Sequence, residues 1–354
     1  MRTILKDVIK KIYYWLGFYP PQRILPVREY YKHIKGYPEE IIEYQLQLLS
    51  LQIKNISSNK SNEYYNQLLK KFIPEWSLLD AQYRFIKNFG HGLGESSLAT
   101  FRKVKIKNNI LFEKVYFNSY LDLKNVLWFQ KNIYPLLKNK IRIPEIKKVY
   151  EGYIISVAYF DYMELKPFKD KQTLISSEIK LSKDLYIVSK NNQEYIRQLD
   201  IENGLFDFRQ HFLYKEQKKS AKNNLNKIGI DFDFLEKQIS VSFLIINHGD
   251  IYKTNFYQEN TLIDWDTFGF YPIGLEVAFL YQRLLWSENL KEENFSNWLK
   301  INYQETISEE IWNEFERNTF FFLYVFNQCL FEEMKYLNLK EELILELSKV
   351  KIHQ

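Results

Sequence analysis

Residues 248–266 read HGDIYKTNFYQENTLIDWD and are the most informative stretch of the chain. Asp250 and Asn255 stand in the spacing D-x4-N, and a β-type run at 261–263 leads to Asp264. Such a set supplies one carboxylate to orient an attacking hydroxyl, and an amide and a second carboxylate to hold Mg²⁺ on a nucleotide. The stretch therefore predicts a site for phosphoryl transfer.

The same stretch resembles one branch of the kinase-like enzymes. Residues 248–250, HGD, and 263–266, IDWD, stand where protein kinases usually have His-Arg-Asp and Asp-Phe-Gly. This pattern is similar to that of the aminoglycoside phosphotransferase and choline kinase-like superfamily, whose members phosphorylate small hydroxylated molecules. Residues 274–278, GLEVA, are similar to the family's Gly-x-Asp-Leu-Ala helix start, with Glu276 in place of the usual Asp.

The resemblance implies a protein kinase-like α+β fold with two lobes. We expect a β-rich, nucleotide-binding N-lobe at 80–165 and an α-helical C-lobe with the catalytic and metal site at 166–354. Residues 1–79 lie outside the match, and their pattern predicts an N-terminal helical extension. At 354 residues the chain is long enough to bury two such cores.

The resemblance also implies roles for single residues. Asp250 is expected to accept a hydrogen bond from the acceptor hydroxyl, and Asn255 and Asp264 to bind Mg²⁺. His248 is expected to brace the loop rather than to act as an acid or base. For Asp266 the sequence leaves two roles open, a second metal held through water or a solvent-facing position.

A glycine-rich segment at 89–97 precedes these residues, and three of the 11 glycines fall within five positions of it. Glycine lets backbone N–H groups approach phosphate oxygens that a side chain would keep away. We expect this segment to cover the nucleotide phosphates, and a plain hairpin turn is the alternative. The expected phosphate-binding residues are Gly90, Gly92, Gly94, Ser96 and Ser97.

The next predicted strand, 110–117, contains Lys114, where the kinase fold has the lysine that binds nucleotide phosphates. An exposed position on the alternate face of the strand is the other interpretation. Kinases usually pair this lysine with a Glu from the following helix, but the helix predicted at 120–137 contains no Glu. Gln130 is the first candidate for that place and Asp122 is the second.

A β-type run at 153–160 leads to DYMEL at 161–165, where the family has the hinge between its lobes. The family's hinge backbone meets the adenine base, and the corresponding residues here are Tyr162, Met163 and Glu164. The apolar run at 241–247 predicts the strand that leads to His248. The remaining predicted helices are 171–198, 206–228, 232–240, 275–285, 292–299, 308–331 and 340–350.

Composition limits the class of protein. Cys329 is the only cysteine, so an intramolecular disulfide and a cysteine-based metal site are excluded. The net charge of +5 suits a nucleotide or an anionic substrate, and it is too small and scattered to indicate nucleic acid. The N-terminus lacks a clean apolar signal segment, and the longest apolar run, 320–326, is too short to span a membrane. A cytoplasmic protein is therefore expected.

Residues 6–16, KDVIKKIYYWL, combine lysines with aromatic and aliphatic side chains. A basic amphipathic helix of this kind can lie on the inner face of an anionic membrane. Packing on a lobe or against a partner chain is the favoured alternative.

The predicted activity is transfer of the γ-phosphoryl group of ATP, with Mg²⁺, to a hydroxyl of a sugar, glycan or amino-alcohol, in cell-surface polysaccharide or lipid synthesis. An aminoglycoside-type antibiotic phosphotransferase is less favoured, because a polycationic substrate needs an acidic cleft and the chain is basic. A pseudokinase or nucleotide-binding regulatory module is the other alternative. The absent helix Glu favours it, and the intact Asp250, Asn255 and Asp264 oppose it.

Overall fold

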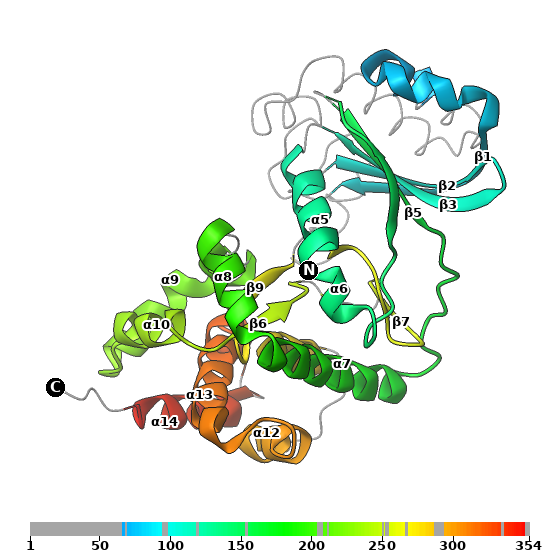
Figure 1. Cartoon of the computed structure of the whole chain (residues 1–354). Coiled ribbons are helices and arrows are strands. Elements are labelled where there is room, and N and C mark those ends of the chain that lie inside the picture. Colours follow the sequence, from blue (N-terminus) through cyan, green and yellow to red (C-terminus); the bar gives the residue numbers. More distant parts are fainter. Residues whose placement is uncertain are drawn as a thin grey trace, which may run out of the picture. The chain divides into compact units, whose positions relative to one another are not determined.

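The computed structural model describes residues 66–67, 69–93, 98–117, 120–152, 155–203, 208–210, 212–249, 251, 255–265, 268–286, 294–333 and 336–350. The described chain divides into two compact units (Figure 1). Unit 1 holds the described residues up to Gln130 together with Pro144–Glu164, and unit 2 holds Lys131–Ile143 and the described residues from Leu165 onward. The expected N-lobe ran without a break from 80 to 165, whereas here residues 131–143 belong with the helical unit.

Unit 1 is built on a five-stranded antiparallel sheet in the order β1-β2-β3-β5-β4 (Figure 1). A two-residue turn joins β2 to β3, with Lys107 at φ 55°, as tight hairpins of this twist require. The sequence predicted four of the strands and missed β4. The strands are β1 Tyr83–Leu93, β2 Leu98–Ile106, β3 Asn109–Phe117, β4 Ile146–Tyr150 and β5 Ile155–Asp161.

Helix α5 (Tyr120–Asn132) covers one face of this sheet. Leu123 and Val126 of the helix form an apolar cluster with Tyr116 and other strand residues. The helix predicted at 120–137 is in fact two, because the chain breaks at 133 before a short α6 (Tyr134–Leu137) that has a proline in its first turn. Proline lacks an N–H group and its ring clashes with the preceding turn, so it starts a helix more readily than it continues one.

A buried ion pair lies on the other face of the sheet. Arg102 and Glu113, both 0% exposed, are bonded across β2 and β3. The Tyr159 hydroxyl donates to Glu113 Oε2 at 2.9 Å, and Trp76 Nε1 donates to the Tyr159 oxygen at 2.6 Å. We call these four residues the buried network. Burial raises the pKa of Tyr159, and the neighbouring Glu113 carboxylate raises it further, so its hydroxyl stays protonated.

The segment before β1 belongs to the core of unit 1. Leu69, Ile73 and Trp76 are 0%, 2% and 0% exposed, and Trp76 lies in η3 (Pro74–Gln82). The expected end of the N-terminal extension, residue 79, thus falls inside η3. The part of the extension before 66, including the basic-aromatic residues 6–16, lies outside the described residues.

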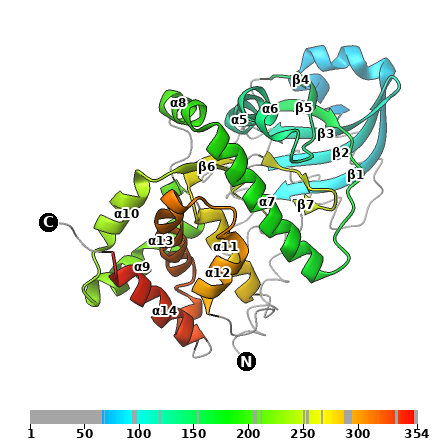
Figure 2. The same ribbon diagram turned by 60° about the horizontal axis from the view of Figure 1, so that its bottom comes forward.

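Unit 2 is mainly helical, and its two short sheets are the pairs β6–β9 and β7–β8 (Figure 2). The α+β architecture with a strand-rich and a helix-rich unit confirms the predicted fold class. No helix in the described ranges is long and apolar enough to cross a lipid bilayer. The elements are α7 Lys171–Asn191, α8 Gln193–Asn203, η4 Phe208–Gln210, α9 Phe212–Lys227, α10 Phe232–Ser240, β6 Leu244–Asn247, β7 Phe256–Tyr257, β8 Thr261–Leu262, β9 Gly269–Pro272, α11 Leu275–Trp286, α12 Phe295–Tyr303, α13 Glu309–Phe326, η6 Leu330–Glu332 and α14 Leu337–Ser348.

The core of unit 2 surrounds α13. Its last seven residues, 320–326, are all at most 2% exposed, so this half of the helix is apolar on every side and packed on every side. Gly274 precedes α11 at φ 100°, and a Cβ there would lie 2.6 Å from Oγ1 of Thr319 on α13. Glycine therefore permits the close approach of the two helices. The helix predicted at 308–331 ends earlier, where the Asn327 side chain donates to the carbonyl of Leu323 at 2.7 Å.

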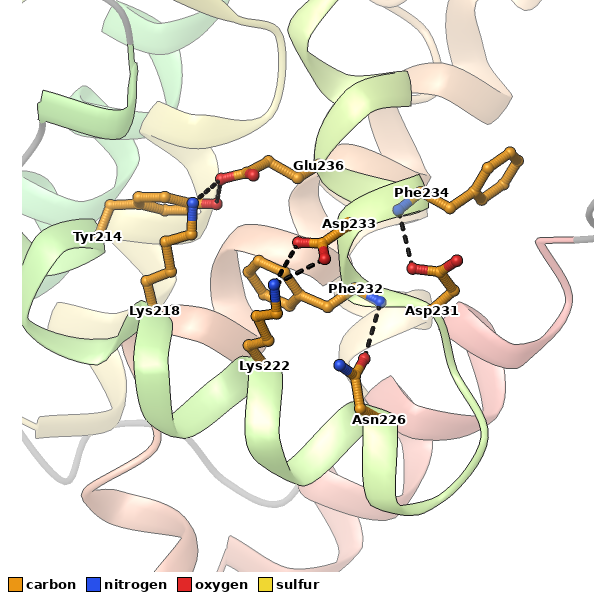
Figure 3. A network of polar contacts seen from close by, with 9 residues as sticks. All are labelled: Tyr214, Lys218, Lys222, Asn226, Asp231, Phe232, Asp233, Phe234 and Glu236. Atoms are coloured by element: carbon orange, nitrogen blue, oxygen red, sulfur yellow. Dashed lines mark hydrogen bonds and ion pairs between the residues drawn. The ribbon is translucent and has the colours of Figure 1, made fainter.

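Helices α9 and α10 form a charge-matched hairpin (Figure 3). Lys222 of α9 binds Asp233 at 2.6 Å, and Lys218 binds Glu236 (Figure 3). Two of the five lysines of α9 are therefore paired with carboxylates of α10. These ion pairs join the two helices of the hairpin.

Candidate active site

Strand β6 leads into His248, whose side chain is 0% exposed. Its Nε2 lies 2.8 Å from the carbonyl oxygen of Ile263, and because a carbonyl only accepts, Nε2 carries the proton and donates. The ring also meets Trp265 edge to face, with centroids 4.7 Å apart. His248 thus contacts both chain neighbours of Asp264, and this geometry suits a bracing role.

Gly249 turns the chain directly after this histidine. It has φ 79°, a left-handed conformation that glycine adopts without a steric penalty, and its N–H donates to Asn247 Oδ1 at 2.8 Å. Asp250, the predicted catalytic residue, follows and lies outside the described residues, as do 252–254 and Asp266. The structure therefore gives the position at which the catalytic loop starts, and the role of Asp250 stays a prediction.

The β7–β8 hairpin brings Asn255 and Asp264 together. Phe256 pairs with Leu262 in its ladder, and beyond that pair the N–H of Ile263 donates to the carbonyl of Asn255 at 2.9 Å. Asn255 and Asp264 therefore flank the open end of one hairpin, although eight residues separate them in the sequence. The sequence predicted only the β-type run at 261–263, and the pairing of β8 with β7 produces this adjacency.

Asp264 has a left-handed backbone with φ 65°, one of four non-glycine residues at positive φ in the described ranges. Such a conformation costs on the order of 1–2 kcal/mol and persists where the surroundings impose it, often at functional sites. The bonds of Ile263 on one side and the packing of Trp265 on the other impose it here. The Asp264 side chain is exposed, whereas Asn255 is buried, with 8% of its surface exposed.

The oxygens of Asn255 and Asp264 fit Mg²⁺. Magnesium prefers hard oxygen ligands and is usually held by one or two protein groups, with phosphates and water completing its shell. Within the described ranges, no group of three or more His, Cys, Asp or Glu side chains could hold a metal ion by itself. A magnesium site with Asn255 and Asp264 as its protein ligands would need phosphates or water to complete it.

Lys114 lies in a row that crosses the sheet of unit 1. Its register partners are Phe101 on β2 and Ala158 on β5, and Phe101 in turn pairs with Gly90 on β1. The Lys114 side chain is 4% exposed, and its Nζ lies 5.4 Å from the Phe101 ring centroid and 5.0 Å from that of Tyr116. The row thus joins the first glycine of the predicted phosphate loop to the predicted phosphate lysine.

The glycine-rich segment differs from the loop that the sequence suggested. β1 continues to Leu93, so Gly90 and Gly92 are strand residues, and Gly92 pairs with Ala99 across the hairpin. The segment is therefore part of a β-hairpin, and the contact of Gly90 and Gly92 with phosphates stays a prediction. Gly94, Ser96 and Ser97 lie at the tip, outside the described residues, so their contact with phosphates stays a prediction.

Gln130 makes hydrogen bonds that the sequence did not predict. Its Nε2 donates to the carbonyl of Pro144 at 2.9 Å, and its Oε1 accepts from the N–H of Ile146 at 3.4 Å. The amide thereby joins α5 to the start of β4. This explains why a glutamine occupies the position, while its expected contact with Lys114 stays a prediction. Of Asp122 only the backbone is described, in α5.

The predicted hinge residues follow β5. Tyr162 and Met163 are partly buried and Glu164 is exposed. Lys103 of β2 places its Nζ 3.7 Å from the centroid of the Tyr162 ring, a close cation–π contact. Sequence reasoning missed this contact, since it depends on the register of β2.

The buried network was also missed. Glu113 and Lys114 are adjacent charged residues in an otherwise apolar strand, and alternation sends their side chains to opposite faces. That pattern was a usable signal for a buried acid that needs a partner. The partner, Arg102, could be identified only from the β2–β3 register, which pairs the two residues directly.

The chain is similar at low identity to solved structures of small-molecule kinases and phosphotransferases. No family model matches the chain, and no curated protein matches it. An ethanolamine kinase from Plasmodium vivax has a similar solved structure, with 14% identity, coverage of 81% of this chain and 92% of that chain, and a TM-score of 0.42. The structure of an aminoglycoside phosphotransferase from Streptomyces rimosus has 12% identity and a TM-score of 0.41, and the match covers 75% of this chain and 98% of that chain. The structure of a choline kinase from Cryptosporidium parvum has 15% identity and a TM-score of 0.38, and the match covers 81% of this chain and 95% of that chain.

Proposed function

We propose that this protein is a kinase that transfers the γ-phosphoryl group of ATP, with Mg²⁺, to a hydroxyl of a small acceptor. The observation that carries the proposal is the end of the β7–β8 hairpin. There the N–H of Ile263 donates to the carbonyl of Asn255, which brings Asn255 beside the left-handed Asp264. His248 is bonded to the carbonyl of the same Ile263 and braces it. An amide and a carboxylate held side by side on a fixed backbone can share one hard cation.

Each residue has a distinct part in this proposal. Asn255 and Asp264 hold Mg²⁺, which when bound offsets the negative charge of the nucleotide phosphates. Asp250 accepts a hydrogen bond from the acceptor hydroxyl and keeps its oxygen aimed at the phosphorus. His248 donates its Nε2 proton to the backbone and is fully buried, which suits a bracing role rather than that of a general base.

Lys114 is proposed to bind phosphate oxygens. Its side chain is almost fully buried beside aromatic rings, where a cation interacts with an anion more strongly than it does in water. The backbone around Gly90 and Gly92, on β1, lies two strands away from Lys114 in the same sheet. The N–H groups of the hairpin tip, with Ser96 and Ser97, would cover the phosphates.

Positive charge on unit 1 also supports a nucleotide. Lys103 pairs directly with Lys87 across β1 and β2, and Lys105 pairs with Arg84. Like charges directly opposite each other destabilise a sheet, and a bound anion would offset that cost. Lys103 alternates with the buried Arg102, so it lies on the same face as Lys114.

For the acceptor we propose a neutral or anionic sugar, a glycan or an amino-alcohol, used in cell-surface polysaccharide or lipid synthesis. The basic sheet face and the net charge of +5 support this class over polycationic aminoglycosides. Residues 6–16 would give peripheral contact with the inner face of the membrane if the acceptor is a glycolipid.

The test is Mg²⁺-dependent ATP consumption by the full chain with a panel of acceptors. The panel holds sugars, sugar phosphates, choline, ethanolamine, a glycolipid extract and one aminoglycoside.

Asp264→Asn keeps the left-handed backbone, which asparagine tolerates, and removes the charge, so turnover should fall while the protein stays folded. Asp250→Asn should lower kcat by about 10²–10⁴-fold with nucleotide affinity retained. Wild-type turnover by Asp264→Asn would contradict the metal assignment.

A pseudokinase is the second candidate, and the use of Gln130 favours it. The helix that usually supplies a Glu to the strand lysine has none, and its glutamine is bonded to Pro144 and Ile146 instead. This candidate predicts nucleotide binding with no turnover for any acceptor. Calorimetric titration with ATP, with and without Mg²⁺, separates the two candidates from a protein that binds no nucleotide.

A further inference from the structure

The tip of the β7–β8 hairpin is bonded to a separate segment of unit 2. The N–H of Arg142 donates to the carbonyl of Asn260 at 2.9 Å, and the N–H of Leu262 donates to the carbonyl of Arg142 at 3.0 Å. These two bonds form a parallel bridge between Arg142 and Thr261. Residues 140–142 therefore extend the hairpin on one side.

A second segment is bonded to the other strand of the hairpin. The N–H of Gln258 donates to the carbonyl of Lys166 at 2.9 Å, and its Nε2 donates to the carbonyl of Pro167 at 2.8 Å. Glu259 at the tip then binds both segments, with Lys166 Nζ at 2.6 Å and Arg142 Nη1 at 2.8 Å. One carboxylate thus joins three pieces of chain.

Asn260 completes these contacts. Its Nδ2 donates to the carbonyl of Lys140 at 2.6 Å and lies 3.4 Å from Asp184 Oδ2 on α7. Glu259 and Asn260 have φ values of 60° and 52°, so two consecutive non-glycine residues are left-handed. Such strain persists where the surroundings impose it, and the bonds to 140–142 and 166–167 do so here. We call Glu259, Asn260, Arg142 and Lys166 the hairpin clamp.

The clamp lies beside the points where the chain passes between the units. Arg142 is next to Ile143, the last residue before the chain returns to unit 1, and Lys166 follows Leu165, where it enters unit 2. The opposite end of the same short hairpin carries Asn255 and Asp264. Both connecting segments are therefore bonded to the element that presents the proposed metal ligands.

We propose that Glu259 and Asn260 are positioning residues that hold Asn255 and Asp264 in register for Mg²⁺. This inference rests on the proposed function, since it concerns the same metal site. Two strands of two residues each cannot fix their own register firmly, because a ladder this short has few bonds. The clamp supplies the missing constraint at the tip, and a change of register there would separate the two ligands at the other end of the hairpin.

The expected effects differ between the two residues. Glu259 is 50% exposed, and surface ion pairs of this kind shift an equilibrium by less than about fivefold. Glu259→Gln should therefore raise the dissociation constant for metal by about twofold to fourfold. Asn260→Gly keeps the left-handed backbone and removes the amide bonds, so a larger rise of about fivefold to twentyfold is expected, with more motion of the hairpin.

The experiment titrates Mn²⁺, as a spectroscopic substitute for Mg²⁺, into the full chain saturated with ATP and follows free Mn²⁺ by electron paramagnetic resonance. Lys107→Gly is the control for Asn260→Gly, because Lys107 is also a left-handed turn residue, in the β2–β3 hairpin. Glu346→Gln is the control for Glu259→Gln, because Glu346 also forms a side-chain ion pair, with Lys349. Both controls should bind Mn²⁺ as wild type does, and all variants should bind ATP without metal equally well.

Three outcomes decide the proposal. Weaker Mn²⁺ binding by both clamp variants, with controls unchanged, supports it. Wild-type Mn²⁺ affinity in Asn260→Gly, even with lower thermal stability, overturns it and leaves the proposed function standing, because the clamp would then be merely structural. Failure of the wild-type ATP complex itself to bind Mn²⁺ more tightly than free ATP overturns both.

Discussion

Arg102→Met tests the energetic reasoning about the buried network. Arg102 and Glu113 are both 0% exposed, so the substitution leaves the Glu113 carboxylate buried without its cation. Breaking a buried pair by removing one partner costs about 3–5 kcal/mol, a large part of the 5–15 kcal/mol that typically holds a domain together. The free energy of unfolding of unit 1 should fall by that amount.

The double variant Arg102→Met/Glu113→Leu should recover most of the loss. Replacing both partners by apolar side chains of similar size is often neutral, because the desolvation penalty of both charges disappears. The main remaining cost is the buried Tyr159 hydroxyl, which loses its acceptor but still accepts from Trp76 Nε1, and this amounts to about 1 kcal/mol. The Tyr83 hydroxyl and the Asn66 side chain also lose a partner, but both residues are half-buried and add less. The two substitutions should therefore be strongly non-additive.

Hydrogen exchange of peptides from β2 and β3, measured over increasing urea, reports on unit 1 separately from unit 2. The control is Lys147→Met on β4, which removes an ion pair that is 43% exposed and should change little. A loss below about 1 kcal/mol in Arg102→Met would refute the reasoning, as would a double variant whose loss equals the sum of the two single losses.

Three further predictions follow from single contacts. Gly274→Ala should destabilise unit 2 by about 2–4 kcal/mol in urea unfolding, because a Cβ at φ 100° would lie 2.6 Å from an α13 side chain; a change below 1 kcal/mol would contradict this. Gln130→Glu should destabilise the α5–β4 junction by about 1–2 kcal/mol, because a carboxylate would face the Pro144 carbonyl; a stabilised variant in a thermal melt would contradict it. Burial raises the pKa of Glu178 above its ordinary value of 4.5, although the nearby Arg283 lowers it. The contribution of Glu178 to the free energy of unfolding is therefore present below pH 4.5 and is lost as pH rises through the folded-state pKa. Glu178→Gln should flatten this decrease in unfolding free energy when urea unfolding is measured from pH 4.5 upward, and an unchanged dependence on pH would contradict the prediction.

The fold was predictable where one local signal dominated. The strand that contains Lys114 and the β-type run at 261–263 were visible from their residue types, and α11 from its glycine-led helix start. β4 was missed because IKKVY mixes two lysines into a five-residue edge strand, which weakens the alternation. The early end of α5 was missed because an apolar period continued past the proline at 135.

The sequence indicates the residue types of the proposed site but not the contacts that support them. The spacing of Asn255 and Asp264 indicated metal ligands, and the hairpin explains the spacing. Nothing local to Glu259 or Asn260 indicated that they are bonded to 140–142 and 166–167, since those contacts join segments about 90 to 120 residues apart. The position of Gln130 was predicted from a family pattern, whereas its bonds follow from the path of β4.

The all-round burial of residues 320–326 determines how the protein behaves once it opens. FFFLYVF has no charge and no proline, and its side chains are mostly of the types that favour β-structure. Seven-residue segments of this kind stack readily between chains when they are exposed, and in the folded state α13 protects this one only by lying at the centre of unit 2. Thermal unfolding of unit 2 should therefore end in aggregation, so that the lifetime of the protein at high temperature reflects the rate of opening rather than an equilibrium.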